Sequence, residues 1–136
     1  MKNQKSIWLL FLGAGLMIAA CKKEETPDPT PPAPTRTEML SKMWKPDTVL
    51  VNGTNATLFF ANLRVNFNAN GQYILNDPFL GSDTGQWVFR NSETQIVLDP
   101  GMDEEVWDIN TLTATKLKVR IDDPDEVVDI VFSPAN

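Results

Sequence analysis

Few residues in this chain of 136 could carry covalent or acid–base chemistry. It contains one cysteine, Cys21, and no histidine. Serine–histidine–aspartate catalysis, cysteine–histidine catalysis and the usual zinc sites all need imidazole, so these chemistries are excluded. Carboxylates are abundant, but nothing in the sequence places two of them at a defined separation in an apolar cleft. We therefore expect a protein that is not an enzyme and that needs no cofactor or metal.

Many of the carboxylates fall into two clusters, and each cluster lies in a polar stretch of sequence that we expect to form a loop. The clusters are Asp99, Asp103, Glu104 and Glu105, and then Asp122, Asp123, Asp125 and Glu126. The first offers oxygen donors to calcium but does not match the EF-hand spacing, so we interpret both clusters as solvated loops. The chain has 12 basic and 18 acidic residues, a formal net charge of −6. This balance argues against a nucleic-acid partner, which needs a basic face.

The lone cysteine ends an apolar segment at the start of the chain. Two lysines precede the uncharged run that begins at Ile7, and residues 18–21 read I-A-A-C. A basic start, an apolar middle and small residues before a cleavage point are typical of a secretory signal peptide. A cysteine directly after two alanines resembles the lipobox of bacterial lipoproteins. That resemblance implies that the Cys21 thiol becomes lipidated and anchors the chain to a membrane.

The lipobox resemblance also implies how the chain is divided into segments and where in the cell it is located. Residues 1–20 would be the signal peptide, 21–35 an extended proline-rich tether and 36–136 the folded domain. In lipoprotein families an aspartate after the cysteine favours the inner membrane. Lys22 stands there, so we expect the outer membrane. Residues 23–25 (K-E-E) are similar to surface-export signals, which leaves both the periplasmic face and the cell surface open.

Hydrophobic alternation indicates β-structure beyond residue 43. Segments such as 63–67 and 116–121 alternate apolar and polar residues, as antiparallel strands with one wet face do. We expect a short helix over 37–43, capped by Thr37, and then eight strands in a barrel or sandwich. The strands should lie at about 43–51, 61–68, 72–76, 85–90, 94–99, 104–110, 115–121 and 126–132.

One hairpin defines a register. Asn70-Gly71 could form a two-residue turn, which would place Phe67 opposite Ile74. A three-residue loop, 69–71, instead places Phe67 opposite Tyr73 and keeps one set of apolar residues on one face. We predict the three-residue loop, with Gly71 at positive φ.

An up-and-down meander sorts its loops between two ends. Short loops at 69–71, 91–93 and 111–113 should share the end where the tether enters. The opposite end should hold the longer loops, namely 52–60, 77–84, 100–103 and 122–125. The long-loop end would then carry Phe59, Phe60, Phe79 and Leu80. These side chains could form a lid over a ligand-binding mouth or a plug in the barrel end, and we favour the plug.

Aromatic residues on the strands are the other binding candidates. Trp44, Trp87, Trp107 and Tyr73 offer flat surfaces that could stack on a ligand, although strand aromatics more often belong to the core, which we favour. The candidate ligand-binding residues are Phe59, Phe60, Phe79, Tyr73, Trp87 and Trp107.

Scattered motifs resemble the small lipocalin-like lipoproteins of Gram-negative bacteria. They are Leu40, Trp44-Lys45, residues 67–73 (F-N-A-N-G-Q-Y), 85–87 (G-Q-W) and 109–113 (I-N-T-L-T) before Leu117. The likeness covers about residues 36–133 and implies an all-β fold, an eight-stranded antiparallel meander closed into a small barrel. The implied function is binding of a small apolar or amphipathic molecule near the long-loop end. The alternative is a non-enzymatic envelope interaction or structural protein with a filled barrel.

The anchor can be tested directly. Cys21→Ala should leave the secreted chain without lipid and move nearly all of it from the membrane fraction to the soluble fraction, because the two or three acyl chains would be lost. Cell fractionation and intact-mass measurement report the two effects. A chain that stays with the membrane after signal cleavage would place the anchor elsewhere.

Overall fold

The computed structural model describes residues 30–79 and 81–136. The segment expected to be a signal peptide, Cys21, most of the expected tether and Leu80 therefore lie outside the described residues. Residues Pro34–Asn136 form one compact unit. Within the described ranges, no helix combines the length and the apolar character needed to cross a membrane.

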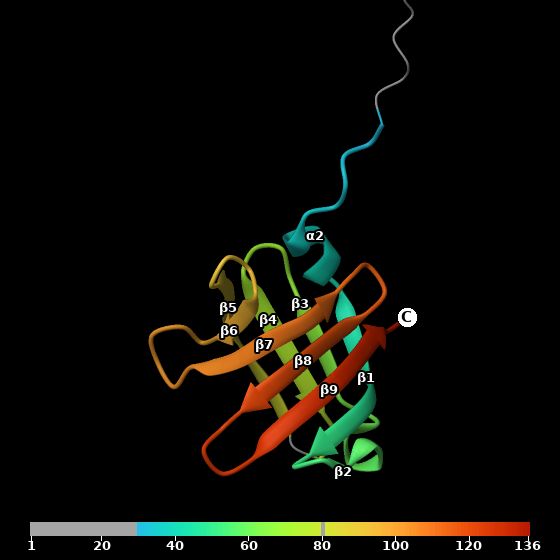
Figure 1. The fold of residues 1–136 in the computed structure, drawn as a ribbon, viewed down its shortest axis with the longest axis vertical. Helices are drawn as coiled ribbons and strands as arrows, with labels where there is room; N and C mark the ends of the chain where they lie inside the picture. Colours follow the sequence, from blue (N-terminus) through green and yellow to red (C-terminus); the bar gives the residue numbers. More distant parts are fainter. Residues whose placement is uncertain (1–29, 80) are drawn as a thin grey trace, which may run out of the picture. The chain divides into compact units, whose positions relative to one another are not determined.

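The unit is a closed antiparallel β-barrel with a short helix at its start, as Figure 1 shows. Each strand pairs with the next along the sheet, and β1 also pairs with β9, which closes a ring of eight strands. The two-residue strand β2 extends β1 as a small hairpin. The elements are α2 (Arg36–Leu40), β1 (Met43–Val51), β2 (Thr54–Asn55), the 3-10 helix η2 (Thr57–Phe60), β3 (Arg64–Phe67), β4 (Gln72–Asp77), β5 (Gly81–Arg90), β6 (Gln95–Leu98), β7 (Glu105–Leu112), β8 (Leu117–Asp122) and β9 (Val127–Pro134). The predicted fold class is confirmed.

The register predicted for the hairpin between β3 and β4 is also confirmed. Phe67 lies opposite Tyr73, and Val65 lies opposite Leu75. Gly71 has φ 92°, and its N–H donates to the Asn68 carbonyl at 3.0 Å. The backbone needs glycine there because the left-handed region is costly for residues with a Cβ.

Two predicted loops were wrong. Residues 81–84 pair with β4, from Gly81 opposite Asp77 to Thr84 opposite Ile74. Strand β5 therefore begins at Gly81, inside the long loop that we expected at 77–84. On the other side β7 runs on to Leu112, so the turn expected at 111–113 falls at 113–116 instead. Strand β5 extends through exposed polar residues, where backbone pairing continues without hydrophobic alternation to mark it. Strand β7 extends past a register shift between Ile109 and Thr111, which interrupts its alternation.

The predicted helix cap was wrong as well. Thr35, and not Thr37, caps α2, because it places Glu38 at the third helical position. The Thr35 hydroxyl accepts from Glu38 N at 3.1 Å, and the Glu38 carboxylate accepts from Thr35 N at 2.7 Å. This reciprocal capping box satisfies two amides of the first turn. The helix ends at Leu40 and does not reach residue 43.

Large rings fill the barrel interior. Phe67 is buried, and its ring meets Trp87 and Trp107 edge-on at centroid distances of 5.8 Å and 6.0 Å. Trp107 stacks on Phe132 at 5.9 Å. Trp44 is also buried, and its Nε1 donates to the Leu40 carbonyl at 2.9 Å, which ties α2 to the barrel. The prediction that the strand tryptophans belong to the core is confirmed.

Helix α2 marks the short-loop end. Arg36 Nε donates to the Glu93 carbonyl at 2.9 Å, and Lys42 Nζ donates to the Ala114 carbonyl at 2.6 Å. These contacts fix α2 over the β5–β6 and β7–β8 turns. In Figure 1 β2 lies at the opposite end of the barrel from α2.

The filled interior predicts a large cost for removing its central ring. Phe67→Ala should lower the free energy of unfolding by about 3–5 kcal/mol, because it removes buried contacts and leaves a cavity. Phe59→Ala is the matched control: Phe59 is 77% exposed, so its loss should cost less than about 0.5 kcal/mol. Urea unfolding measures both, and similar losses would contradict this description of the core.

Candidate functional site

The site begins at a gap in the barrel wall. Strands β1 and β3 pair at only two positions, Met43 with Asn66 and Trp44 with Val65. Beyond these pairs, towards the long-loop end, η2 takes the place of β3 along β1. Val49 N donates to the Thr57 hydroxyl at 3.0 Å, and Ala56 N donates to the Val49 carbonyl at 2.8 Å.

The apolar residues of η2 point in two directions. Phe60 is partly buried and packs against the core, so the plug prediction holds for this ring. Leu58 and Phe59 are 89% and 77% exposed. A 3-10 helix has three residues per turn, so positions 57 and 60 share one side and positions 58 and 59 do not.

Phe79 joins this group from the turn between β4 and β5. Its N–H donates to Asp77 Oδ1 at 2.7 Å, a local bond that shapes the turn, and its side chain is 80% exposed. The plug prediction was therefore wrong for Phe59 and Phe79, whose rings project into solvent. No structural statement applies to Leu80, which lies outside the described residues.

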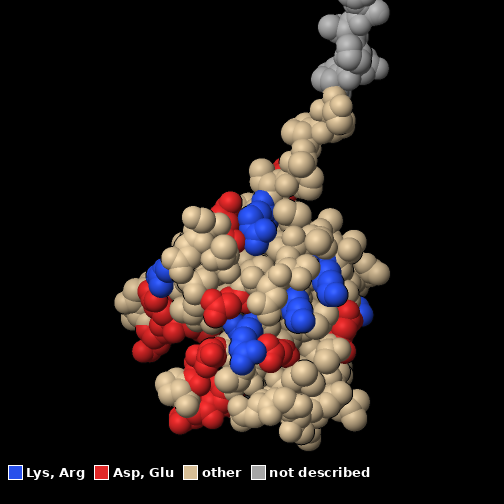
Figure 2. All heavy atoms as spheres, in the orientation of Figure 1, with Lys and Arg blue, Asp and Glu red and all other residues tan. Residues whose placement is uncertain are grey.

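Four apolar side chains line one hollow at this end of the barrel. They are Leu58, Phe59, Phe60 and Phe79, around a volume of about 500 Å³. We call this group the apolar rim. Figure 2 shows an uncharged surface over β2 and its surroundings, while acidic side chains gather over the β8–β9 turn. Leu58 was missed in the sequence, although the run of apolar residues at 58–60 inside a loop could have indicated it.

The other candidate residues do not meet the apolar rim. Trp87 and Trp107 are buried in the core. Trp87 Nε1 donates to the Asn68 carbonyl at 2.9 Å, and Trp107 Nε1 donates to the Glu105 carboxylate. Their polar edges are thus satisfied within the fold, as is usual for buried tryptophan.

Tyr73 lies instead in a hydrogen-bonded group with two aspartates. Its hydroxyl donates to Asp99 Oδ2 at 2.8 Å and lies 3.3 Å from Asp83 Oδ2. Burial, the hydrogen bond to Asp99 and the two negative charges raise the pKa of Tyr73 well above its ordinary value, which keeps the phenol a proton donor. Gly85 makes room for this contact, because a Cβ there would lie 2.0 Å from Asp99 Oδ1.

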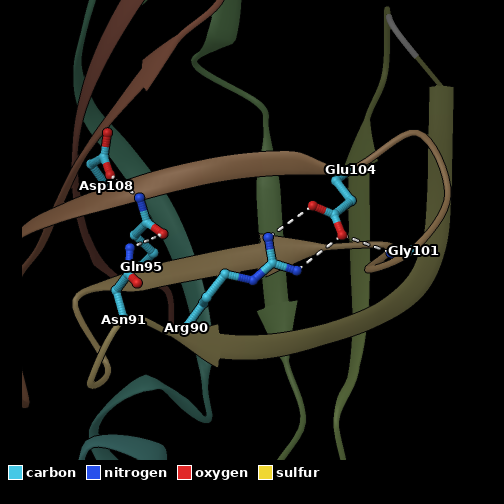
Figure 3. A network of polar contacts seen from close by, with 6 residues as sticks. All are labelled: Arg90, Asn91, Gln95, Gly101, Glu104 and Asp108. Atoms are coloured by element: carbon cyan, nitrogen blue, oxygen red, sulfur yellow. Dashed lines mark hydrogen bonds and ion pairs between the residues drawn. The ribbon is translucent and has the colours of Figure 1, made fainter.

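The neighbouring acidic loop is held by a polar network on the outer face of β5, β6 and β7, shown in Figure 3. Arg90 donates to both carboxylate oxygens of Glu104, at 2.8 Å and 2.9 Å. Gly101 N donates to the same carboxylate at 2.8 Å. Nearby, Gln95 Nε2 donates to Asp108 Oδ1 at 2.7 Å. The loop that we expected to be simply solvated is therefore pinned to the barrel through Glu104.

These acidic groups do not form a recognisable metal centre. Across residues 30–79 and 81–136, no three acidic side chains come together in an arrangement that could hold a metal ion. Asp99 accepts a hydrogen bond from Tyr73, and Glu104 accepts one from Arg90, so both carboxylates stabilise the fold.

Comparison with known proteins supports the fold and does not extend beyond it. No family model matches the chain, and no curated protein matches it. Among solved structures, the barrel is similar to a lipocalin-like protein from Bacteroides uniformis, with a TM-score of 0.50 and 15% sequence identity. The match covers 71% of this chain and 99% of that one. The chain thus has a lipocalin-like fold.

The Glu104 interaction predicts a pH dependence of stability. The hydrogen bonds from Arg90 and from the Gly101 amide lower the pKa of Glu104 to about 2. A carboxyl whose folded pKa is depressed stabilises the fold above its unfolded pKa, and this contribution is lost as the pH falls through the folded value. Wild type should therefore be more stable than Glu104→Gln at pH 6, and the difference should shrink steadily from about pH 4.5 to pH 2.

Denaturant unfolding at several pH values measures that difference. Arg90→Gln should lose stability with the same pH profile, because it removes the partner of the same carboxylate. A difference between wild type and Glu104→Gln that stays constant from pH 6 to pH 2 would contradict the assignment.

Proposed function

We propose that this chain is an outer-membrane lipoprotein, anchored through Cys21, whose lipocalin-like barrel binds a small apolar or amphipathic molecule at the apolar rim. The observation that carries the binding proposal is the exposure of Leu58, Phe59 and Phe79 around one uncharged hollow. The proposed role is binding, without catalysis. Exposed apolar residues that adjoin one another are typical of interaction sites, whereas scattered ones are normal.

The size and chemistry of the hollow suit a small ligand. Its volume of about 500 Å³ lies within the usual range for small-molecule sites. A ligand there would cover the rings of Phe59 and Phe79 and rest on Phe60, whose other side packs on the core. Full burial of one such ring contributes about 1.5–3 kcal/mol. The ligand would sit at the barrel end, because aromatic rings occupy the interior where larger lipocalins have a deep cup.

The direction of chain entry supports the anchored arrangement. The chain enters the barrel through α2 at the short-loop end, where Arg36 and Lys42 hold the adjoining turns. The apolar rim lies at the other end. A membrane anchor upstream of α2 would leave the rim accessible.

The filled interior favours a second candidate, a non-enzymatic envelope interaction or structural protein. Phe67 packs against both Trp87 and Trp107 in the core of the barrel. In this candidate function the apolar rim would be covered by another protein and would bind no small molecule.

Binding at the rim can be tested with a neutral probe. The barrel, residues 34–136, carries its own complete core and can be titrated with Nile red, with dodecanol as competitor. Replacing both Phe59 and Phe79 by serine should weaken binding at least tenfold, since each ring would lose about 1.5 kcal/mol or more of apolar contact. Met102→Ser, at a 75% exposed site outside the rim, is the matched control and should bind like wild type.

The result separates the two candidates. Saturable binding that the double variant loses supports the small-ligand function. Absence of saturable binding by wild type, with the fold intact by circular dichroism, would reject it and leave the protein-interaction candidate.

A further inference from the structure

A second hollow adjoins the apolar rim and lies against β1, β2 and η2. It has a volume of about 430 Å³, and two side chains of the rim, Leu58 and Phe59, belong to its lining as well. We call it the polar hollow. A ligand at the rim that extends past Leu58 and Phe59 therefore reaches polar groups. The other lining residues of the polar hollow are Asp47, Thr48, Asn55, Ala56 and Thr57.

Strand β1 and its hairpin with β2 bring these polar groups to one face. Asp47 is left out of the pairing between β1 and β9, as the extra residue of a bulge. Val49 is buried in the core, so its neighbours Thr48 and Leu50 point to the outer face of the barrel. Leu50 pairs with Asn55 across the hairpin, which places the Asn55 side chain on that same outer face.

Two groups of the polar hollow can form hydrogen bonds with a ligand. Asn55 Oδ1 accepts from Thr57 N at 2.9 Å, which holds the side chain in place, and its amide nitrogen carries two hydrogens to donate. The Thr48 hydroxyl can both donate and accept. Within residues 30–79 and 81–136, neither the Thr48 hydroxyl nor Asn55 Nδ2 hydrogen-bonds to another residue. The Thr57 hydroxyl is already occupied, because it accepts from Val49 N.

The charges beside the two hollows favour a neutral ligand. Among the described residues, Asp47 is the one charged side chain that lines either hollow. Its Oδ1 accepts from the Ser133 hydroxyl at 2.9 Å and lies 3.5 Å from Lys45 Nζ. An anionic head group would meet this carboxylate, and a cationic one would compete with Lys45 for it. A neutral head group avoids both costs.

The nearest cation on the other side of η2 is Arg64, at the start of β3. It lines neither hollow. Its Nη1 donates to two backbone carbonyls between η2 and β3, at 3.2 Å and 2.7 Å. The guanidinium is thus held by the chain that leads into β3, and the test below includes an anion that would bind to it.

We infer that the ligand of the apolar rim is a non-ionic amphiphile, a single alkyl chain with a hydroxylated head group. This inference rests on the small-ligand function proposed for the rim and specifies its ligand class. The alkyl chain covers Phe59 and Phe79, and the hydroxyl groups form hydrogen bonds with Thr48 and Asn55 in the polar hollow. An uncharged apolar surface beside a few neutral polar groups suits such a molecule at both of its ends.

The test compares four competitors that share one chain length and differ in the head group. They are 1-monododecanoylglycerol, dodecanol, dodecanoate and dodecylammonium, each kept below the concentration at which it aggregates. Each is used to displace Nile red from the barrel, residues 34–136. 1-Monododecanoylglycerol should bind about tenfold more tightly than dodecanol, because its head group adds hydrogen bonds. The two ions should bind more weakly than 1-monododecanoylglycerol.

Variants of the polar hollow test the head-group contacts without altering the rim. Thr48→Val keeps the branched side chain and removes the hydroxyl, so it should weaken 1-monododecanoylglycerol binding about fivefold. Together with Asn55→Ala, the loss should exceed about tenfold. Direct binding of Nile red should change less than twofold in both variants, which also shows that they fold. Thr84→Val, at an exposed position of β5 that lines neither hollow, is the matched control and should bind like wild type.

The outcomes distinguish the ligand class from the rim function itself. Failure of wild type to bind Nile red would reject the rim function and this inference with it. With Nile red bound normally, two results would overturn the ligand class alone: equal affinity for 1-monododecanoylglycerol and dodecanol, or an unchanged 1-monododecanoylglycerol affinity in the two variants. Tighter binding of dodecanoate would place the head group at Arg64, and tighter binding of dodecylammonium would place it at Asp47. Either result would also overturn the inference.

Discussion

The packing of Phe67 between Trp87 and Trp107 is the constraint on which the rest of this barrel depends. The edge-on contacts occupy the centre of a ring of only eight strands, which has an interior just wide enough for side chains. These buried rings occupy the centre, where an eight-stranded barrel can otherwise hold one small ligand. Outside this core, the barrel presents the exposed and uncharged apolar rim at one end.

Most of the fold could be predicted because alternation is a strong signal wherever one face is buried. Residues 63–67 and 116–121 carry it plainly, and the buried set also selected the correct register opposite Tyr73. The start of β5 could not be predicted, because residues 81–84 are exposed and their pairing rests on backbone bonds alone. Thr35 and Thr37 are equivalent as caps until the spacing to Glu38 is taken into account.

The candidate site was less predictable, because the sequence does not say which way a loop aromatic points. Phe59 and Phe60 are adjacent, yet one faces solvent and the other packs on the core, and the 3-10 geometry of η2 decides between them. Trp87 and Trp107 were binding candidates only because their rings are flat, and both are buried in the core. The register shifts beside Thr48 and at Asn110 could not be predicted either, because a bulge leaves no mark in a hydrophobic pattern.

The short pairing between β1 and β3 gives the barrel one weak seam. Every other neighbouring pair around the ring shares at least four paired positions, whereas this one has two. Local unfolding starts where the fewest contacts must break, so the amides beside η2 should be among the first to exchange with solvent. An opened seam would expose a free strand edge, which can pair with another chain. Because η2 contacts β1 beside this seam, a ligand or partner bound at the apolar rim would also slow the opening of the seam.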